Sequence, residues 1–577
     1  MKLRSFRFCF LCILFASAVN ACALDREAFT FTKYDLNVRI EPDQQRLGVR
    51  GTITLRNDSQ APQKIAVLQI SSSLSWRSIK AGSKPLQFIS QPYTSDIDHT
   101  GSLSEAIVTL PEAIAPKGSV DVEIAYEGVI VLDPTRLTRI GAPEDQARSS
   151  DWDQISPKFT AVRGIGYVAW YPIATEAAAL SDGSDVALTV DRWKSRHADS
   201  TMSVFFQGTV DEPILFSGNP NGFVVQNNEH VAKMASFSML RMGTNVPTFL
   251  QADFRKLDAS GISAINYLPG FEAPAQAYVE ALTNLDPLPT AKGSRHLQVA
   301  QLPDPNASEF VSESILLLPL KPAVTEQDKL AIVYAIARGE TLSPRPWIAE
   351  GLAHYAQAVD VEQRHGHAAA LTYLSTHSSA LAQSEIDHSP TKPTTELGSN
   401  ALAAQHSLIN SADELYVGSK AMYVWWMLRD LLGGKDPAFF LLDYDPAKDN
   451  EPSYAQRLIE KRSQRDLEWF FDDWVYRDRG LPDFKVASAF TRKTLPEGYL
   501  LTITIENLGA AGAEVPFTVK FEGGEITKRL LVPGKSNAVT RVEVPKQPDE
   551  IRVNDGSVPE SDTTNNLFKI EPSDASK

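Results

Sequence analysis

The hydrophobic periodicity of this chain changes twice along its length, and this change limits the folds it can adopt. From Thr30 onward, apolar residues alternate with polar ones, which is typical of half-buried strands. From about Pro274 to Gly480 the apolar spacing is helical, and after Pro482 the alternation returns. With 577 residues, the chain also exceeds what one hydrophobic core normally serves. We therefore expect a multidomain α+β protein with a mainly helical part between two β parts.

The first β part is expected to span residues 28–245 as an all-β domain. Its clearest signal is a predicted hairpin, in which a turn at 41–45 separates two alternating runs whose apolar members are Tyr34, Leu36, Val38 and Ile40, then Val49, Ile53 and Leu55. Further short alternating runs follow as far as about residue 206, separated by Gly, Pro, Asn and Asp.

The helical part carries three local signals. Thr325 followed three residues later by Asp328 predicts a capping box at the start of a helix. A second helix is expected to begin near Pro346, and a third to cover 415–432. Within the third, residues 421–428 are apolar all round, which predicts burial on every side.

The remaining segments are predicted from composition. Residues 389–399 contain two prolines and are typical of a surface loop. Residues 483–571 carry short alternating runs at 501–505, 517–521 and 539–544, so a small β-sandwich is expected there, with a frayed tail at 572–577.

The first residues indicate export. Three basic residues precede the apolar run Phe8–Val19, and Ala21-Cys22-Ala23 follows as a cleavage site, which is the arrangement of a secretory signal peptide over residues 1–23. The mature protein is therefore expected in the periplasm or outside the cell. No later run is long enough to span a membrane, so no transmembrane span is expected.

Cysteine and charge restrict the chemistry further. The three cysteines lie within this first segment, so the mature chain is expected to have neither disulfides nor thiol chemistry. Residues 19–22 also resemble the box before a lipidated cysteine, which leaves a lipid anchor at Cys22 as an alternative. The formal net charge is −15 and no basic cluster occurs, which argues against a nucleic-acid partner.

Three segments resemble the membrane alanyl aminopeptidase family of gluzincin metallopeptidases. Residues 347–355 read W-I-A-E-G-L-A-H-Y, similar to the family's W-L-x-E-G-x-A-x-Y. Residues 420–429 resemble its K-G-A-x-V-x-x-M-L-R helix, and residues 470–482 resemble its F-F-x-x-W and G-x-P close. The resemblance implies an N-terminal β-saddle domain, a thermolysin-like, mainly helical domain at 246–482 and a C-terminal β-sandwich.

The resemblance also assigns a zinc site. It makes Glu350 the third zinc ligand and places H-E-x-x-H 18 residues earlier, on Gln327-Asp328-Lys329-Leu330-Ala331. Gln327 and Ala331 stand in the two histidine positions, and Asp328 stands in that of the general base. Alanine has no donor atom, and an amide is a poorer zinc ligand than imidazole. The sequence therefore predicts a site without its metal and no cofactor.

At two further positions of the family's pattern, this sequence has different residues. The exopeptidase signature G-x-M-E-N falls on residues 306–310, where only Glu309 matches, as a candidate peptide-binding residue. The transition-state tyrosine position is occupied by Gly418, and Tyr416, two residues earlier, could serve only if the spacing changed.

Structural roles are also expected for these residues. Asp328 suits a helix N-terminus whatever its ancestry. Glu350 and His354 are four residues apart on one helix face, so they could form a structural pair or jointly hold a weak metal. Tyr416 is expected in the first turn of its helix.

Three functions fit the sequence. The first is an aminopeptidase-like protein that has lost zinc and hydrolysis and binds a peptide or partner protein in the inherited cleft. The second is an active metallopeptidase whose zinc site is rebuilt around Glu350 and His354. The third is a scaffold of the cell envelope. The ligand pattern favours the first, and metal content would separate it from the second.

Overall fold

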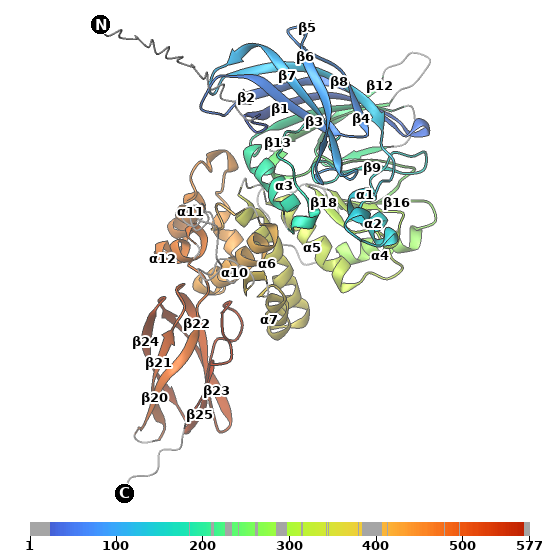
Figure 1. Ribbon diagram of the computed structural model, residues 1–577. Helices are drawn as coiled ribbons and strands as arrows, with labels where there is room; N and C mark the ends of the chain where they lie inside the picture. The colour runs from blue at the N-terminus through green and yellow to red at the C-terminus, as the bar shows by residue number, and fades with distance from the viewer. Residues whose placement is uncertain are drawn as a thin grey trace, which may run out of the picture.

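The computed structural model describes residues 24–183, 185–208, 213–225, 233–240, 242–259, 263–283, 297–312, 315–341, 343, 345–378, 380–382, 407–411, 413–477, 479–494 and 497–570. The predicted signal peptide with Cys22, the loop at 389–399 and the tail at 572–577 lie outside these residues. The described chain is a mixed α+β protein with several sheets (Figure 1). No helix in these ranges has both the length and the apolar content to cross a membrane.

The predicted N-terminal hairpin is confirmed. Strands β1 (Phe29–Glu41) and β2 (Arg46–Asn57) pair antiparallel, with Leu36 opposite Gly51 and Val38 opposite Val49. The apolar members of both strands are buried because alternate side chains of a strand point to one face.

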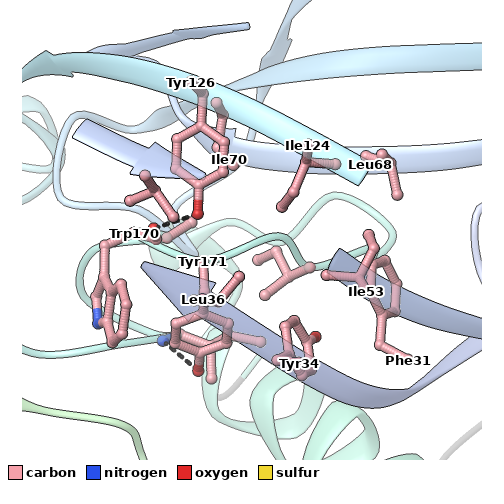
Figure 2. Packing of buried hydrophobic residues seen from close by; sticks show 14 of the residues in the cluster. Phe31, Tyr34, Leu36, Ile53, Leu68, Ile70, Ile124, Tyr126, Trp170 and Tyr171 are labelled. Atoms are coloured by element: carbon pink, nitrogen blue, oxygen red, sulfur yellow. Dashed lines mark hydrogen bonds between the residues drawn. The ribbon is translucent and has the colours of Figure 1, made fainter. Parts of the chain in front are cut away.

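The hairpin belongs to an eight-stranded sheet in the order β12-β13-β10-β1-β2-β8-β4-β5, which packs on a three-stranded sheet in the order β3-β7-β6. Trp170 and Tyr171 enter the same core from a loop, and the Tyr126 hydroxyl donates a 2.8 Å hydrogen bond to the carbonyl of Trp170 (Figure 2). The other strands of this part are β3 (Gln63–Ser71), β4 (Leu74–Ala81), β5 (Lys84–Pro85), β6 (Gln87–Thr94), β7 (Ser102–Ile114), β8 (Ser119–Val129), β9 (Thr160–Val162), β10 (Thr201–Gly208), β11 (Ile214–Phe216), β12 (Asn219–Val225), β13 (Lys233–Leu240) and β14 (Phe249–Gln251).

The expectation that residues 28–245 would be all-β is wrong for three segments. Helices α1 (Thr135–Arg139), α2 (Glu144–Ser150) and α3 (Asp185–Arg196) lie among the strands. In α3, Val186, Val190 and Trp193 are buried, at spacings of three and four residues that place them on one helix face. This spacing was available in the sequence and outweighs the strand-rich surroundings.

The expectation of helical structure from Pro274 onward is also wrong in part. Strands β17, β18 and β19 lie in this region, after helix α4 (Glu272–Thr283). They belong to a five-stranded sheet in the order β15-β16-β17-β19-β18, whose strands β15 and β16 precede Pro274. In β19, Leu316 and Leu318 pack into one hydrophobic cluster, while Ile315 and Leu317 pack into another. A strand covered on both faces is continuously apolar, so its sequence resembles that of a buried helix. The strands are β15 (Arg255–Ala259), β16 (Ser263–Tyr267), β17 (Leu297–Gln301), β18 (Phe310–Ser312) and β19 (Ile315–Leu318).

The helices predicted after this sheet are present. Helix α5 (Glu326–Glu340) begins with the predicted capping box of Thr325 and Asp328, and α6 (Pro346–His365) has its proline in the first turn. Helix α10 (Glu414–Leu431) is buried throughout 421–428, as its apolar run predicted. The other described α-helices of this part are α7 (His367–Thr376), α11 (Tyr454–Ser463) and α12 (Glu468–Phe471), and a π-helical turn at Asp472–Tyr476 follows α12.

The last part contains two facing sheets, in the orders β20-β21-β24 and β23-β22-β25-β26. Their inward residues share one hydrophobic cluster with α6 and α10, and the Trp474 indole donates a 2.8 Å hydrogen bond to the carbonyl of Gly512. These sheets are therefore packed against the helices (Figure 1). The strands are β20 (Phe484–Lys493), β21 (Tyr499–Asn507), β22 (Ala513–Phe521), β23 (Gly524–Val532), β24 (Ser536–Val544), β25 (Pro548–Val553) and β26 (Leu567–Lys569).

Candidate functional site

A cavity of about 610 Å³ lies where the N-terminal β part meets helices α5 and α6. Helix α3 contributes one wall, and Figure 1 shows this helix between the upper sheets and the helices below. A second cavity of about 210 Å³ adjoins it, and Lys194, Arg338 and Glu350 line both. Glu309 and His354, also candidates from the sequence, line the larger cavity with Glu350. The fold therefore brings Glu309, which is distant in the sequence, to the same site as Glu350 and His354 of α6.

Glu350 is held by two side chains of α5. Its Oε1 accepts a 2.7 Å hydrogen bond from Nε of Arg338, and its Oε2 accepts one from the Tyr334 hydroxyl. The side chains of Arg338 and Glu350 are 10% and 23% exposed, so the ion pair is largely shielded from water. The carboxylate that the family resemblance assigns to zinc is therefore paired with a guanidinium.

The residues in the H-E-x-x-H positions lie at the start of α5. Asp328 is 3% exposed, and its Oδ2 accepts hydrogen bonds of 2.8 and 2.7 Å from the backbone N–H and the hydroxyl of Thr325. Its Oδ1 accepts a 3.1 Å hydrogen bond from Lys321. Burial opposes ionisation, but these hydrogen bonds outweigh it and lower the pKa of Asp328. Asp328 therefore stabilises the helix end as a cap.

The two positions expected for histidine ligands have different environments. Gln327 is exposed in the first turn of α5, and Ala331 is 6% exposed one turn later. Tyr334 and Arg338 follow on the same helix face, at intervals of three and four residues. Tyr334 and Arg338 were not identified as site residues from the sequence. Both lie on the helix face that begins with Gln327 and Ala331, so the helical spacing from Gln327 would have identified them.

Glu309 precedes the outer strand β18 and lines the larger cavity. The surrounding protein removes water from the carboxyl group of Glu309, and this desolvation raises its pKa. The nearby charge of Asp328 also raises the pKa of Glu309, while a hydrogen bond with Gln327 lowers it. Glu309 therefore holds its proton more tightly than an ordinary glutamate.

His354 lies one turn after Glu350. Its Nδ1 is 2.9 Å from Oε1 of Gln357, while Nε2 of Gln357 donates to the carbonyl of Leu330. Because the amide oxygen can only accept, Nδ1 of His354 carries the hydrogen. Burial lowers the pKa of His354, so the ring is neutral near pH 7, with its Nε2 lone pair directed away from Gln357.

Gly418 and Tyr416 lie in the first turns of α10. A Cβ atom added at Gly418 would lie 3.0 Å from Cδ2 and Nε2 of His354, so the imidazole fills the space that a side chain there would need. The Tyr416 hydroxyl accepts a 2.9 Å hydrogen bond from Lys420, and both residues are 2% exposed. Tyr416 is not among the described residues that line either cavity, whereas its neighbours Leu415 and Val417 are.

The donor set around the site is small. Within the described ranges, no group of three or more His, Cys, Asp and Glu residues is arranged to hold a metal ion. Glu350 and His354 line the same cavity, and the described contacts bring no third ligand to them.

No family model matches the sequence, and no curated protein matches it. Solved structures do match. A point mutant of an M1 zinc metallopeptidase from Deinococcus radiodurans shares 14% identity at a TM-score of 0.47, over 79% of this chain and 96% of that one. The same mutant bound to the substrate Tyr-Ser-Ala gives the same values, and the unmutated enzyme gives 15% identity at a TM-score of 0.46.

Proposed function

We propose that this protein is an exported, aminopeptidase-like protein that does not hydrolyse peptides and instead binds a peptide, or a segment of a partner protein, in the cleft beside Glu350. The observation that carries the proposal is the contact of Arg338 and Tyr334 with the Glu350 carboxylate. Two donors from α5 occupy the oxygens that the resemblance assigns to zinc.

The residues do not fit a zinc ion. A catalytic zinc needs three protein ligands and an open position for water. Ala331 supplies no ligand atom, Gln327 is exposed, and Asp328 is committed to the helix cap. Arg338, whose Nε is 2.7 Å from Oε1 of Glu350, would also repel a divalent cation at that carboxylate.

The same cleft suits an extended peptide. Strand β18 is the outer strand of its sheet among the described residues, and it pairs with β19 on one side. Phe310 and Val311 of this strand line the larger cavity. The outer edge of a strand carries backbone groups that an extended peptide can pair with. The cavity also lies within the volume range of ligand sites in proteins, roughly 300–1,000 Å³.

The first test is metal content with hydrolysis. Purified protein should contain far less than one equivalent of zinc by elemental analysis and should not cleave aminoacyl fluorogenic substrates. Near-stoichiometric zinc that disappears in Glu350→Ala, together with hydrolysis, would refute the proposal and favour a rebuilt metal site at Glu350 and His354.

The second test is peptide binding. A pool of random heptapeptides is incubated with the protein, and retained peptides are identified by mass spectrometry. Leu415 lines the cavity and is 76% exposed, so Leu415→Trp should reduce retention by adding bulk there. Leu567→Trp in the C-terminal sandwich, at a residue 46% exposed, is the matched control. If no peptide is enriched, or both variants behave alike, peptide binding in this cleft is wrong and a scaffold role is favoured.

A further inference from the structure

The two walls of the larger cavity differ in chemistry. Charged and polar groups come from α5, α6 and the residue before β18, among them Glu309, Arg338 and Glu350. The wall from the N-terminal β part has more apolar residues, among them Ile165, Leu180, Val186, Ala187 and Val190, and its charged residues are Arg136 and Lys194. A ligand here would contact polar groups on one side and an apolar surface on the other.

Helix α3 contributes Val186, Ala187 and Val190 to the apolar wall, and these three residues are here called the α3 wall. Val186 and Val190 are 9% and 8% exposed and belong to the core of the β part, so the wall is held rigidly. A Cβ atom added at Gly166 would lie 3.2 Å from Cγ2 of Val190, which shows how closely the neighbouring loop packs on the helix.

The α3 wall ends at charged residues. Asp191 directly follows Val190, and its Oδ1 is 3.8 Å from Nζ of Lys194. Both residues line the smaller cavity, and Lys194 lines the larger one as well. Leu415, which also lines the larger cavity, keeps 76% of its surface exposed. Apolar residues of α3 and α10 thus line the larger cavity, and the apolar residues of α3 are followed along the helix by charged ones.

We propose that the α3 wall receives an apolar side chain of the bound peptide and so determines which peptides are accepted. This inference rests on the proposed peptide binding. Leu or Phe would replace water on the wall, whereas Asp or Lys would lose hydration against Val186 and Val190 without gaining a partner from them. Burying one Leu or Phe side chain contributes enough to raise affinity by about tenfold or more over Gly.

The heptapeptide pool supplies the test. Retained peptides should carry Leu, Phe, Ile or Met at a fixed position more often than the starting pool. An enriched peptide resynthesised with Gly at that position should bind about tenfold more weakly.

Ala187 allows the wall to be changed without disturbing the core, because it is exposed. Ala187→Phe should cover the α3 wall and abolish the difference between the apolar and Gly peptides, and Ala187→Asp should reverse the preference. Ala368 is exposed in α7 and lines neither cavity, so Ala368→Phe is the matched control and should behave as wild type.

The outcomes separate the two claims. Enriched peptides without an apolar preference, or a preference unchanged in both Ala187 variants, would overturn the role of the α3 wall and leave peptide binding standing. Absence of any enrichment would overturn both.

Discussion

The imidazole of His354 lies where a side chain at position 418 would have to be placed. A Cβ atom on Gly418 would come within 3.0 Å of Cδ2 and Nε2 of the ring. The ring itself is fixed by Gln357, which is in turn bound to the carbonyl of Leu330. The glycine at the family's tyrosine position is therefore explained by packing in this chain.

Because of this contact, we expect Gly418→Ala to have opposite effects on the free energy of unfolding in the wild type and in a His354→Ala variant. Alanine is favoured over glycine inside a helix by about 1 kcal/mol, but crowding in a packed site costs about 1–3 kcal/mol. Gly418→Ala should therefore destabilise the wild type and stabilise a His354→Ala variant by about 1 kcal/mol. Urea unfolding of the four proteins measures this. Destabilisation of equal size in both backgrounds would show that His354 is not the obstacle.

The ion pair of Arg338 with Glu350 should contribute to stability. Arg338→Met leaves the carboxylate, which is 23% exposed, without its cation and should cost about 1–3 kcal/mol in the free energy of unfolding. Arg148, in an exposed pair with Glu144, is the matched control, and Arg148→Met should change stability by at most about 0.5 kcal/mol. Equal effects of the two substitutions in urea unfolding would contradict a special role for Arg338.

Rebuilding the zinc site should require removal of Arg338. Gln327→His, Asp328→Glu and Ala331→His restore the ligand pattern with Glu350, and a glutamate in place of Asp328 would still suit a capping box. We expect low zinc occupancy in this triple variant and higher occupancy once Arg338→Met is added, because the guanidinium no longer competes for the carboxylate.

Hydrolysis by the quadruple variant should stay near background. Gly418 provides no hydrogen-bond donor for the transition state, and loss of one such donor typically costs about 10²–10³ in rate. Zinc titration and aminoacyl fluorogenic substrates test both statements. Full zinc uptake by the triple variant would show that Arg338 is no barrier, and efficient turnover would show that the rest of the machinery is intact.

His197 should make the fold acid-sensitive. Burial lowers the pKa of His197 to about 3 from an ordinary value of 6.5, and Nε2 accepts a 3.1 Å hydrogen bond from the backbone N–H of Phe31. The unfolded chain therefore binds the proton more readily, so stability is fully present above pH 6.5 and is lost as pH falls toward 3. At about pH 4.5 the loss should be about 3 kcal/mol.

His197→Gln removes this titration. The variant should be less stable near neutral pH, and its stability should depend less on pH between about 7 and 4.5 than that of the wild type. Urea unfolding at the two pH values provides the comparison. Parallel pH profiles of wild type and variant would contradict the assignment to His197.

The predicted signal peptide implies that the chain is cleaved during export. We expect the mature chain to begin at Leu24 after removal of residues 1–23, and protein purified from the cell envelope or the medium should give that N-terminal sequence. A blocked N-terminus at a lipidated Cys22 would show that the lipid-anchor alternative is correct.

Local sequence signals were sufficient to predict structure where residues that are neighbours in sequence are also neighbours in space. The capping box needs only Thr325 and Asp328, and the first hairpin needs two alternating runs and a short turn. The burial of 421–428 follows from an uninterrupted apolar run. Each of these features depends on contacts within one element or between adjacent ones, so the residue pattern alone determines it.

Tertiary structure decided the rest. The run Ile315–Leu318 was ambiguous because a strand buried on both faces and a buried helix have the same composition, and only the two clusters on its faces distinguish them. The resemblance placed Glu350 at a zinc site, and the absence of histidines at 327 and 331 was visible in the sequence. That Arg338 and Tyr334 bind this carboxylate, that His354 excludes a side chain at position 418, and that α3 faces the same cavity depend on how separate elements pack. Packing between elements is set by the whole core, which no local pattern encodes.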